Sequence, residues 1–178
     1  MNIQRLLVIS DTHGHVRGME AILNWAQDSS QSGGINAAVF LGDGVPDVRR
    51  GADASGFSCD WRIIRGNSDL EASLPLSDIF EFGGHRFFLC HGHRYDLYNG
   101  FQTLTVVARS SGADAALFGH THIPYCERDG NVLLVNPGSV GRPRSRIGAT
   151  FTVIECEPEK PLRVEFWGID DAGNIRKL

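Results

Sequence analysis

The first half of the chain alternates short apolar runs with polar loops. Residues 5–9 form an apolar run that ends in Asp-Thr-His-Gly. Apolar residues then recur over 16–25 with the spacing of an amphipathic helix, which residues 29–34 should end. Two further apolar runs, 37–41 and 61–64, also end in polar clusters. Because strands that alternate with helices pair in parallel, this half predicts a parallel sheet.

The second half predicts hairpins, and its last two strands alternate as antiparallel strands do. The glycine turn at 83–84 and the Asp-Gly turn at 129–130 predict hairpins, and a helix is expected over 98–110. No repeat or linker divides the chain, so we expect one domain spanning residues 1–178. The strands predicted here are 79–82, 86–90, 115–118, 125–128, 132–135, 149–154 and 162–167.

The composition disfavours several protein classes. A hydrophobic share of 42% and a charged share of 21% are typical of a globular protein. The balance of 17 Lys+Arg against 21 Asp+Glu gives a net charge of −4, so tight nucleic-acid binding is not expected. Apolar runs fall far short of a membrane span, and no secretory signal is visible, so we expect a cytoplasmic protein. The cysteines form no C-x-x-C and are expected to be reduced thiols: Cys59, Cys90, Cys126 and Cys156.

Five polar clusters follow predicted strands. The carboxyl ends of strands in an open α/β sheet form its ligand-binding crevice, so these clusters should meet there. Asp, Asn and His without thiolates suit Mn²⁺, Fe²⁺, Zn²⁺, Ni²⁺ or Co²⁺. The clusters are Asp11-Thr12-His13, Gly42-Asp43, Gly66-Asn67-Ser68-Asp69, His91-Gly92-His93 and Gly119-His120-Thr121-His122.

The spacing within two clusters predicts pairs of side chains on one face. The pairs Asp11/His13 and His120/His122 would each point the same way in an extended backbone. Together with Asp43, Asn67 and His91 they exceed what one ion takes, so we expect two ions bridged by Asp43. Two ions about 3.5–4 Å apart activate a shared water in phosphatases and nucleases. The sequence therefore predicts a dinuclear hydrolytic centre.

The order of these motifs carries a family resemblance. D-x-H, G-D, G-N, H-G-H and G-H-x-H resemble the calcineurin-like metallophosphoesterase superfamily, and Asn136-Pro137-Gly138-Ser139 resembles its small bacterial and archaeal phosphodiesterase branch. This implies an α/β (α+β) fold, a two-sheet β-sandwich flanked by helices, in which a parallel sheet would be only part. It also implies two ligand sets: Asp11, His13, Asp43 and His122 for one ion, and Asp43, Asn67, His91 and His120 for the other.

The resemblance implies a phosphodiesterase whose nucleophile is a hydroxide bridging two divalent ions. We expect a small phosphate-ester substrate and favour Mn²⁺, with Ni²⁺, Fe²⁺, Zn²⁺ and Co²⁺ as alternatives. Two other functions stay open. One is a non-catalytic scaffold, as a relative of this fold provides in the retromer coat, and the other is a nuclease. A homo-oligomer is compatible with the sequence.

Three candidate catalytic residues follow: Asp43, Ser68 and His93. The superfamily's commonest third motif has His where Ser68 stands, and a serine hydroxyl is no ordinary general acid, so poor leaving groups should react slowly. His93 either contacts substrate or donates a proton, or it faces solvent, whereas His15 is expected only to open a helix. A basic cluster that either binds phosphate or stays solvated follows the Pro-Gly-Ser turn: Arg142, Arg144 and Arg146.

Overall fold

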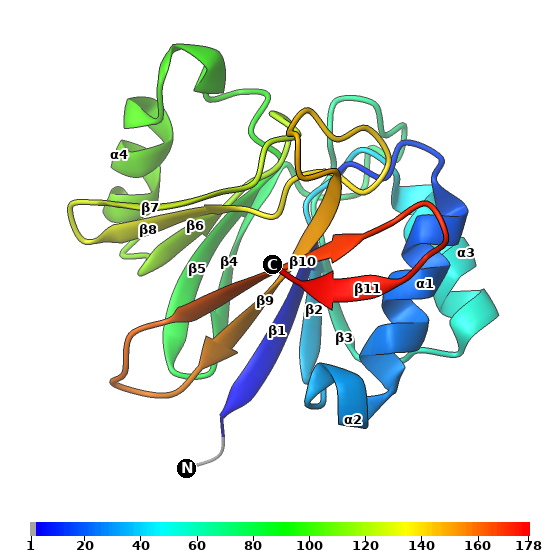
Figure 1. Ribbon diagram of the computed structural model, residues 1–178. Coiled ribbons are helices and arrows are strands. Elements are labelled where there is room, and N and C mark those ends of the chain that lie inside the picture. Colours follow the sequence, from blue (N-terminus) through cyan, green and yellow to red (C-terminus); the bar gives the residue numbers. More distant parts are fainter. Residues whose placement is uncertain (1–2) are drawn as a thin grey trace.

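Two β-sheets pack face to face, with helices on their outer faces (Figure 1). The computed structural model describes residues 3–178. The six-stranded sheet has the order β11 (Ile175–Lys177), β10 (Arg163–Ile169), β9 (Ala149–Cys156), β1 (Gln4–Ile9), β2 (Ala37–Phe40), β3 (Asp60–Ile63). The five-stranded sheet has the order β4 (Ser77–Phe82), β5 (His85–Cys90), β6 (Ala115–Leu117), β8 (Val132–Asn136), β7 (Tyr125–Asp129).

The helices form the two outer layers. The six-stranded sheet is covered by α1 (Val16–Gln27) and α3 (Val45–Ser55), and α2 (Ser29–Ser32) follows α1. On the other side, α4 (Gln102–Ser110) covers the five-stranded sheet, preceded by the 3₁₀ turn η1 (Leu97–Asn99). Among residues 3–178, no helix has both the length and the apolar character to span a bilayer. The sandwich flanked by helices is therefore confirmed.

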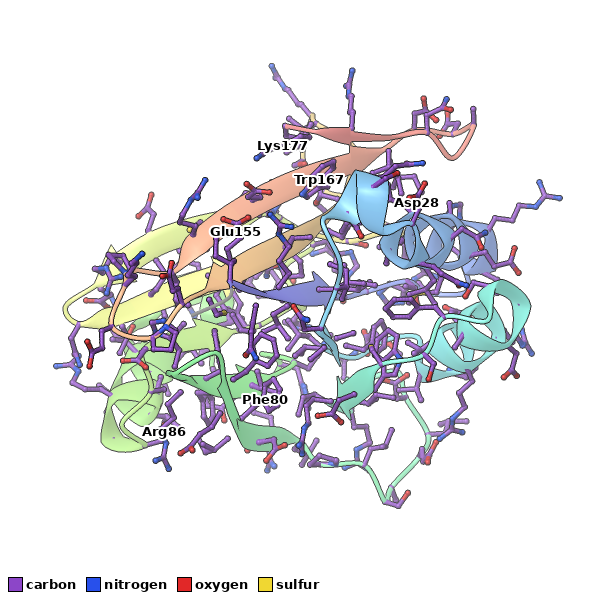
Figure 2. The ribbon with its side chains drawn as sticks, turned by 90° about the horizontal axis from the view of Figure 1, so that it is seen from below. Asp28, Phe80, Arg86, Glu155, Trp167 and Lys177 are labelled. Atoms are coloured by element: carbon purple, nitrogen blue, oxygen red, sulfur yellow. The ribbon has the colours of Figure 1, made fainter. Side chains whose placement is uncertain are left out.

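Strand β1 shows why the apolar runs are continuous. Leu6 and Val8 point into the core between the sheets, whereas Leu7 and Ile9 pack in the core under α1, and all four are fully buried. A strand covered on both faces has no side that favours polar residues. Trp167 of β10, labelled in Figure 2, packs against α1, and the ring centroids of Trp167 and Trp25 lie 4.6 Å apart.

The parallel sheet predicted for the first half of the chain is confirmed for β1, β2 and β3, and it is part of a mixed sheet. Strands β1, β2 and β3 pair in parallel, and so do β5, β6 and β8, but the two groups belong to different sheets. Antiparallel neighbours complete each sheet: β9 pairs with β1, and β4 with β5. The split follows from burial, since both parallel groups need one face against the other sheet and one against a helix.

Local expectations hold except at a few positions. The hairpins at 83–84 and 129–130 and the helix beginning at Val16 are confirmed. The helix expected over 98–110 is interrupted, because Gly100 has φ 124° and ψ 177°, which no helix adopts. The 29–34 segment, expected to be irregular, includes the single turn α2.

Candidate metal centre

The five polar clusters meet at one end of the sandwich. The loops after β1, β2 and β3 come from one sheet, and the loops after β5 and β6 come from the other. The loop between β8 and β9 lies beside them at the top of Figure 1. Because the strands in each parallel group point the same way, residues more than a hundred positions apart in sequence lie in contact.

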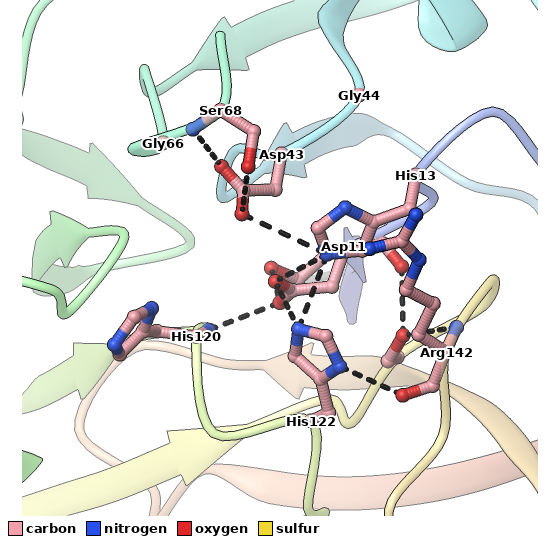
Figure 3. A network of polar contacts seen from close by, with 12 residues as sticks. Asp11, His13, Asp43, Gly44, Gly66, Ser68, His120, His122 and Arg142 are labelled. Carbon is pink, nitrogen blue, oxygen red and sulfur yellow. Dashed lines mark hydrogen bonds and ion pairs between the residues drawn. The ribbon is translucent and has the colours of Figure 1, made fainter.

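Two carboxylates form the centre of the cluster (Figure 3). Asp11 Oδ1 lies 3.1 Å from His122 Nε2 and 3.7 Å from His13 Nε2. Asp43 Oδ2 lies 3.7 Å from His13 Nε2 and 3.5 Å from His91 Nε2. Asp11 and His91 are fully buried, and Asp43 is nearly so. Two groups with metal-ligand spacing result, Asp11/His13/His122 and Asp11/Asp43/His91.

The remaining two predicted ligands flank His91. Asn67 Oδ1 lies 3.1 Å from His91 Nε2, and the ring centroids of His120 and His91 are 5.2 Å apart. The backbone amide of His120 donates to Asp11 Oδ2 at 3.0 Å. All seven predicted ligands therefore lie in one neighbourhood.

The backbone of the site differs from the expected extended pairs. Asp11 and His13 have φ 55° and 44°, and His120 and His122 have φ 68° and 61°. The prediction that these pairs are extended is wrong: the strands end before them, and left-handed turns aim the side chains instead. Asp43 has φ 62°, so five of the seven predicted ligands are non-glycine residues with positive φ. Such strain concentrates at functional sites, where the surrounding structure sustains it.

The donor set fits a cation between its members. His122 Nδ1 lies 2.7 Å from the Arg142 carbonyl, and His91 Nδ1 lies 2.7 Å from the Leu41 carbonyl. A neutral imidazole that donates Nδ1–H in this way presents the Nε2 lone pair to its other neighbour. For His122 that neighbour is Asp11 Oδ1, which is buried and accepts no hydrogen bond from the described residues. Two lone pairs facing one another are repulsive unless a proton or a metal ion lies between them.

The electrostatics keep both carboxyl groups ionised. Burial opposes the ionisation of Asp11, but the imidazoles of His122 and His13 outweigh it and hold its pKa well below the usual range. Burial likewise opposes ionisation of Asp43, but His91 outweighs it and lowers the pKa of Asp43 to about 2. Both groups are carboxylates at neutral pH, the form that binds metals.

Asp69 holds two ligand loops together. Its carboxylate accepts hydrogen bonds from the amides of Asp43, Gly44, Val45 and Gly66 at 2.7–3.0 Å. Two of these amides belong to the first residues of the α3 amino terminus, where a negative charge is favourable. The loop carrying Asp43 is thereby fixed against the loop carrying Asn67. The sequence placed Asp69 in a cluster but gave no sign of this role.

Other buried side chains fix the remaining ligand loops. Asp47 Oδ2 accepts from Thr12 Oγ1 at 2.6 Å and from the Gly14 amide at 2.8 Å. Asn136 donates to the Gly119 carbonyl at 2.8 Å, and Ser139 donates to the Asp11 carbonyl at 2.7 Å. The Asn-Pro-Gly-Ser segment thus holds the loops of both His/Asp pairs.

A cavity of about 430 Å³ opens over the cluster. Ser68 lines it, and its Oγ donates to Asp43 Oδ2 at 3.0 Å. His93 is not among its lining residues in the described chain, although its ring centroid is 5.5 Å from that of His91. Burial and then the charge of His91 lower the pKa of His93. The lining residues are His13, Asp43, Asn67, Ser68, Tyr98, His120, His122, Arg142, Pro143 and Arg144.

Only two of the three arginines in the basic cluster line this cavity, and His15 lies elsewhere. Arg142 and Arg144 line the cavity, whereas Arg146 is not among its lining residues in the part of the chain described. His15 immediately precedes α1 and borders a different cavity. Tyr98 was missed by sequence reasoning because it fell inside the expected helix 98–110, where nothing marked it as different from its neighbours.

A family comparison agrees with this geometry. The family model described as the calcineurin-like phosphoesterase superfamily domain matches residues 4–159. The chain belongs to the calcineurin-like phosphoesterase superfamily. The resemblance carried by the five motifs is thereby confirmed, and it indicates a metal-dependent phosphoesterase.

Individual relatives cover nearly the whole chain. The probable metallophosphoesterase YsnB of Bacillus subtilis is 25% identical over 169 residues, 95% of this chain and 92% of that protein. Phosphodiesterase YfcE of Escherichia coli is 27% identical over 173 residues, 86% of this chain and 88% of that protein.

Solved structures show the same fold. A predicted phosphoesterase from Streptococcus pneumoniae has a TM-score of 0.77 at 26% identity, covering 100% of this chain and 98% of that chain. Vps29 from Entamoeba histolytica, in complex with Zn²⁺, has a TM-score of 0.76 at 20% identity, covering 98% and 97%. At that identity the Vps29 likeness concerns the fold alone.

Proposed function

We propose that this chain is a single-domain phosphodiesterase that hydrolyses small phosphate esters with two divalent transition-metal ions. The observation that carries the proposal is the opposed pair of acceptors at the centre of the site. Asp11 Oδ1 and His122 Nε2 lie 3.1 Å apart, with the His122 proton on the far side of the ring. A metal ion satisfies this arrangement, and the two groups with metal-ligand spacing support the proposal of two ions.

Each ion takes its own set of ligands in this proposal. One set is Asp11, His13, Asp43 and His122, and the other is Asp43, Asn67, His91 and His120. Asp43 is the proposed bridge because its Oδ2 lies at similar distances from one imidazole of each set, 3.7 Å from His13 and 3.5 Å from His91. Asp11 Oδ1 is less evenly placed, at 3.1 Å from His122 and 4.0 Å from His91.

The bound ions would supply Lewis acidity and a hydroxide at neutral pH, which is the nucleophile of the proposed reaction. The chain's own groups orient the components. Ser68 donates to Asp43 through both its amide and its hydroxyl, so it holds the proposed bridging carboxylate in position. Arg142 extends toward His13 and Asp11 in Figure 3 and is placed to hold a phosphoryl oxygen.

We infer from its thiols that the protein is cytoplasmic. All four cysteines are free thiols, and two of them are buried. Burial raises the pKa of Cys156 to about 12, so this thiol is protonated and unreactive at neutral pH. Free cysteines are typical of a reducing compartment.

A hydrolysis panel tests the function. The chelator-treated protein is reloaded with metal and assayed on bis-para-nitrophenyl phosphate, cyclic nucleotides, phosphomonoesters and a single-stranded oligonucleotide. Faster hydrolysis of small diesters supports the proposal, and preference for the oligonucleotide would favour a nuclease. No hydrolysis with any metal would favour the scaffold function, for which the only support is the fold shared with Vps29.

The metal preference is a separate prediction. Imidazole-rich sites bind Mn²⁺ and later transition metals better than Mg²⁺, which prefers oxygen ligands and retains its waters. Four of the seven proposed ligands are histidines, so Mn²⁺ should restore more activity than Mg²⁺ at equal concentration. Titrating each metal into the stripped protein measures this, and equal rescue by Mg²⁺ would contradict it.

A further inference from the structure

Two arginines at the mouth of the cavity have no carboxylate partner. Arg142 and Arg144 line the cavity, and neither forms an ion pair with any of residues 3–178. Only some of the other arginines in residues 3–178 form ion pairs with carboxylates: Arg5, Arg49, Arg62, Arg86 and Arg163. The mouth therefore carries two positive charges that are free to pair with an anion.

Arg144 is nevertheless held in place. Its Nη1 donates to the Tyr98 hydroxyl at 2.9 Å, and its backbone amide donates to the His122 carbonyl at 3.1 Å. A hydroxyl fixes the guanidinium without neutralising it, which a carboxylate would do. Because the hydrogen bond to Tyr98 already orders the guanidinium group, less side-chain conformational entropy is lost when an anion binds.

Tyr98 links Arg144 to the ligand cluster. The Tyr98 ring lies 5.6 Å from the His120 ring, centroid to centroid, and its hydroxyl lies 3.5 Å from the His120 carbonyl and accepts from Arg144 at 2.9 Å. Arg142, in contrast, extends toward His13 (Figure 3). The two arginines thus have different neighbours in the cavity, Arg142 facing His13 and Arg144 held at Tyr98.

The cavity has room for more than the reacting phosphoryl group. Its volume of about 430 Å³ falls within the range of small-molecule sites. A diester bound at the ligand cluster would extend one arm along Tyr98. The end of that arm would meet the Arg144 guanidinium.

We infer that Arg144, oriented by Tyr98, selects phosphodiesters whose non-leaving arm carries a second anionic group, a carboxylate or a phosphoryl group. This inference rests on the proposed function and names its substrate class. Arg144 determines specificity, and Tyr98 is a positioning residue. The second anion pairs with a charge that no residue of the described chain neutralises.

Matched esters test the inference. Para-nitrophenyl butyl phosphate, para-nitrophenyl carboxypropyl phosphate and para-nitrophenyl phosphonopropyl phosphate share a leaving group and differ in the charge of the arm. The Mn²⁺-loaded wild type should favour both charged arms over butyl by about 10-fold or more in kcat/KM, mainly through KM. Comparing the carboxylate and phosphonate arms identifies which anion is preferred.

Variants assign the preference to residues. Arg144→Gln should abolish the charged-arm preference, and Tyr98→Phe should reduce it, because the guanidinium loses its fixed orientation. Arg146→Gln is the matched control: it removes an exposed arginine of the same loop that does not line the cavity, and it should keep the preference. Calorimetry with butyl phosphate and carboxypropyl phosphate should show the same pattern in binding.

The outcomes separate the two proposals. If the wild type hydrolyses no ester, the proposed function fails and the inference fails with it. If it hydrolyses all three esters equally well, or if Arg146→Gln removes the preference as effectively as Arg144→Gln, only the inference is rejected. An equal loss on charged and uncharged arms in Arg144→Gln would also reject it, since Arg144 would then act on the reacting group.

Discussion

Left-handed backbone conformations occur at both ends of the sandwich. Aspartates adopt them at the ligand end, where the five polar clusters meet, and glycines adopt them in the hairpin turns at the opposite end. At the amino-terminal ends of β5 and β8, Gly84 has φ 81° and Gly130 has φ 62°. At the ligand end, Asp11 and Asp43 have φ 55° and 62°. An L-residue pays roughly 1 kcal/mol for this conformation, which glycine avoids. Asp11 and Asp43 adopt it with their side chains buried, which is the pattern of strained residues at functional sites.

Two turns that are held by an aspartate differ in burial. Asp69 accepts hydrogen bonds from four backbone amides and lies partly buried between two ligand loops. Asp170, in the turn between β10 and β11, accepts hydrogen bonds from the backbone amides of Ala172 and Asn174, but it is exposed. Water can replace the contacts of Asp170 and cannot readily replace those of Asp69. Substitutions of the two aspartates should therefore have different consequences.

The largest difference is expected between Asp43 and Glu159, two carboxylate residues that both have positive φ. Asp43→Ala should abolish hydrolysis and remove both ions, because Asp43 is the ligand that the two proposed sets share. Glu159→Ala is the control, since Glu159 also has positive φ, 64°, and lies exposed in the turn after β9. It should keep both metal and activity. Elemental analysis and hydrolysis of bis-para-nitrophenyl phosphate measure the two effects.

Asp11→Ala sharpens the same test. Asp11 belongs to one proposed set only, so this variant should keep one ion. Two ions per chain with normal turnover in Asp43→Ala would show that the bridge is assigned wrongly. Loss of both ions in Asp11→Ala, with one retained in Asp43→Ala, would make Asp11 the bridge instead.

The sequence predicts most strands because the pattern of apolar residues in each strand follows which of its faces are buried. The continuous apolar run at 5–9 fits a strand covered on both faces, and the alternation at 162–167 fits the partly exposed β10. The sequence alone does not say which strands share a sheet. Partners of β1 come from residues 37–40 and 149–156, and such long-range pairing depends on total burial. The family resemblance supplied the two-sheet arrangement that periodicity did not.

For the site, residue types were predictable and backbone geometry was not. The motif order names the seven residues that meet, but the left-handed φ of His13 and His122 has no signal in their spacing. The hydrogen bonds of Asp69 and the place of Tyr98 depend on how loops from different strands pack. A local pattern contains no information on such contacts.

The second prediction concerns Asp69, whose carboxylate holds two ligand loops together. Asp69→Ala leaves four amides without their acceptor and should weaken metal binding about 10–100-fold, as loss of groups that orient ligands typically does. Asp69→Asn keeps one oxygen and should lose less. Asp170→Ala should leave metal affinity as in the wild type. Titration of Mn²⁺ into the stripped proteins measures this, and equal affinities for all variants would contradict it.

The third prediction compares glycines at the two ends. A methyl group at Gly66 would lie 2.1 Å from Asp43 Oδ1 and 2.5 Å from its amide nitrogen. Gly66→Ala must therefore displace Asp43 and should lower metal affinity about 10-fold, a loss comparable to that of other groups that orient ligands. Gly130 has open space around it but positive φ, so Gly130→Ala should cost about 1 kcal/mol of stability with metal binding unchanged. Thermal unfolding and Mn²⁺ titration of both variants test this, and the reverse assignment of effects would contradict it.

The last prediction is made at Ser68, and it concerns leaving groups rather than metal. Ser68 Oγ donates to Asp43, and no general acid occupies its position. Rates should therefore fall steeply as the leaving-group pKa rises across a series of aryl and alkyl esters. Ser68→His should flatten that dependence, because proton donation typically contributes ~10²–10⁴-fold for a basic leaving group and little for nitrophenolate. His93 does not line the cavity in the described chain. A shallow wild-type slope that steepens in His93→Ala would make His93 the donor and reject this prediction.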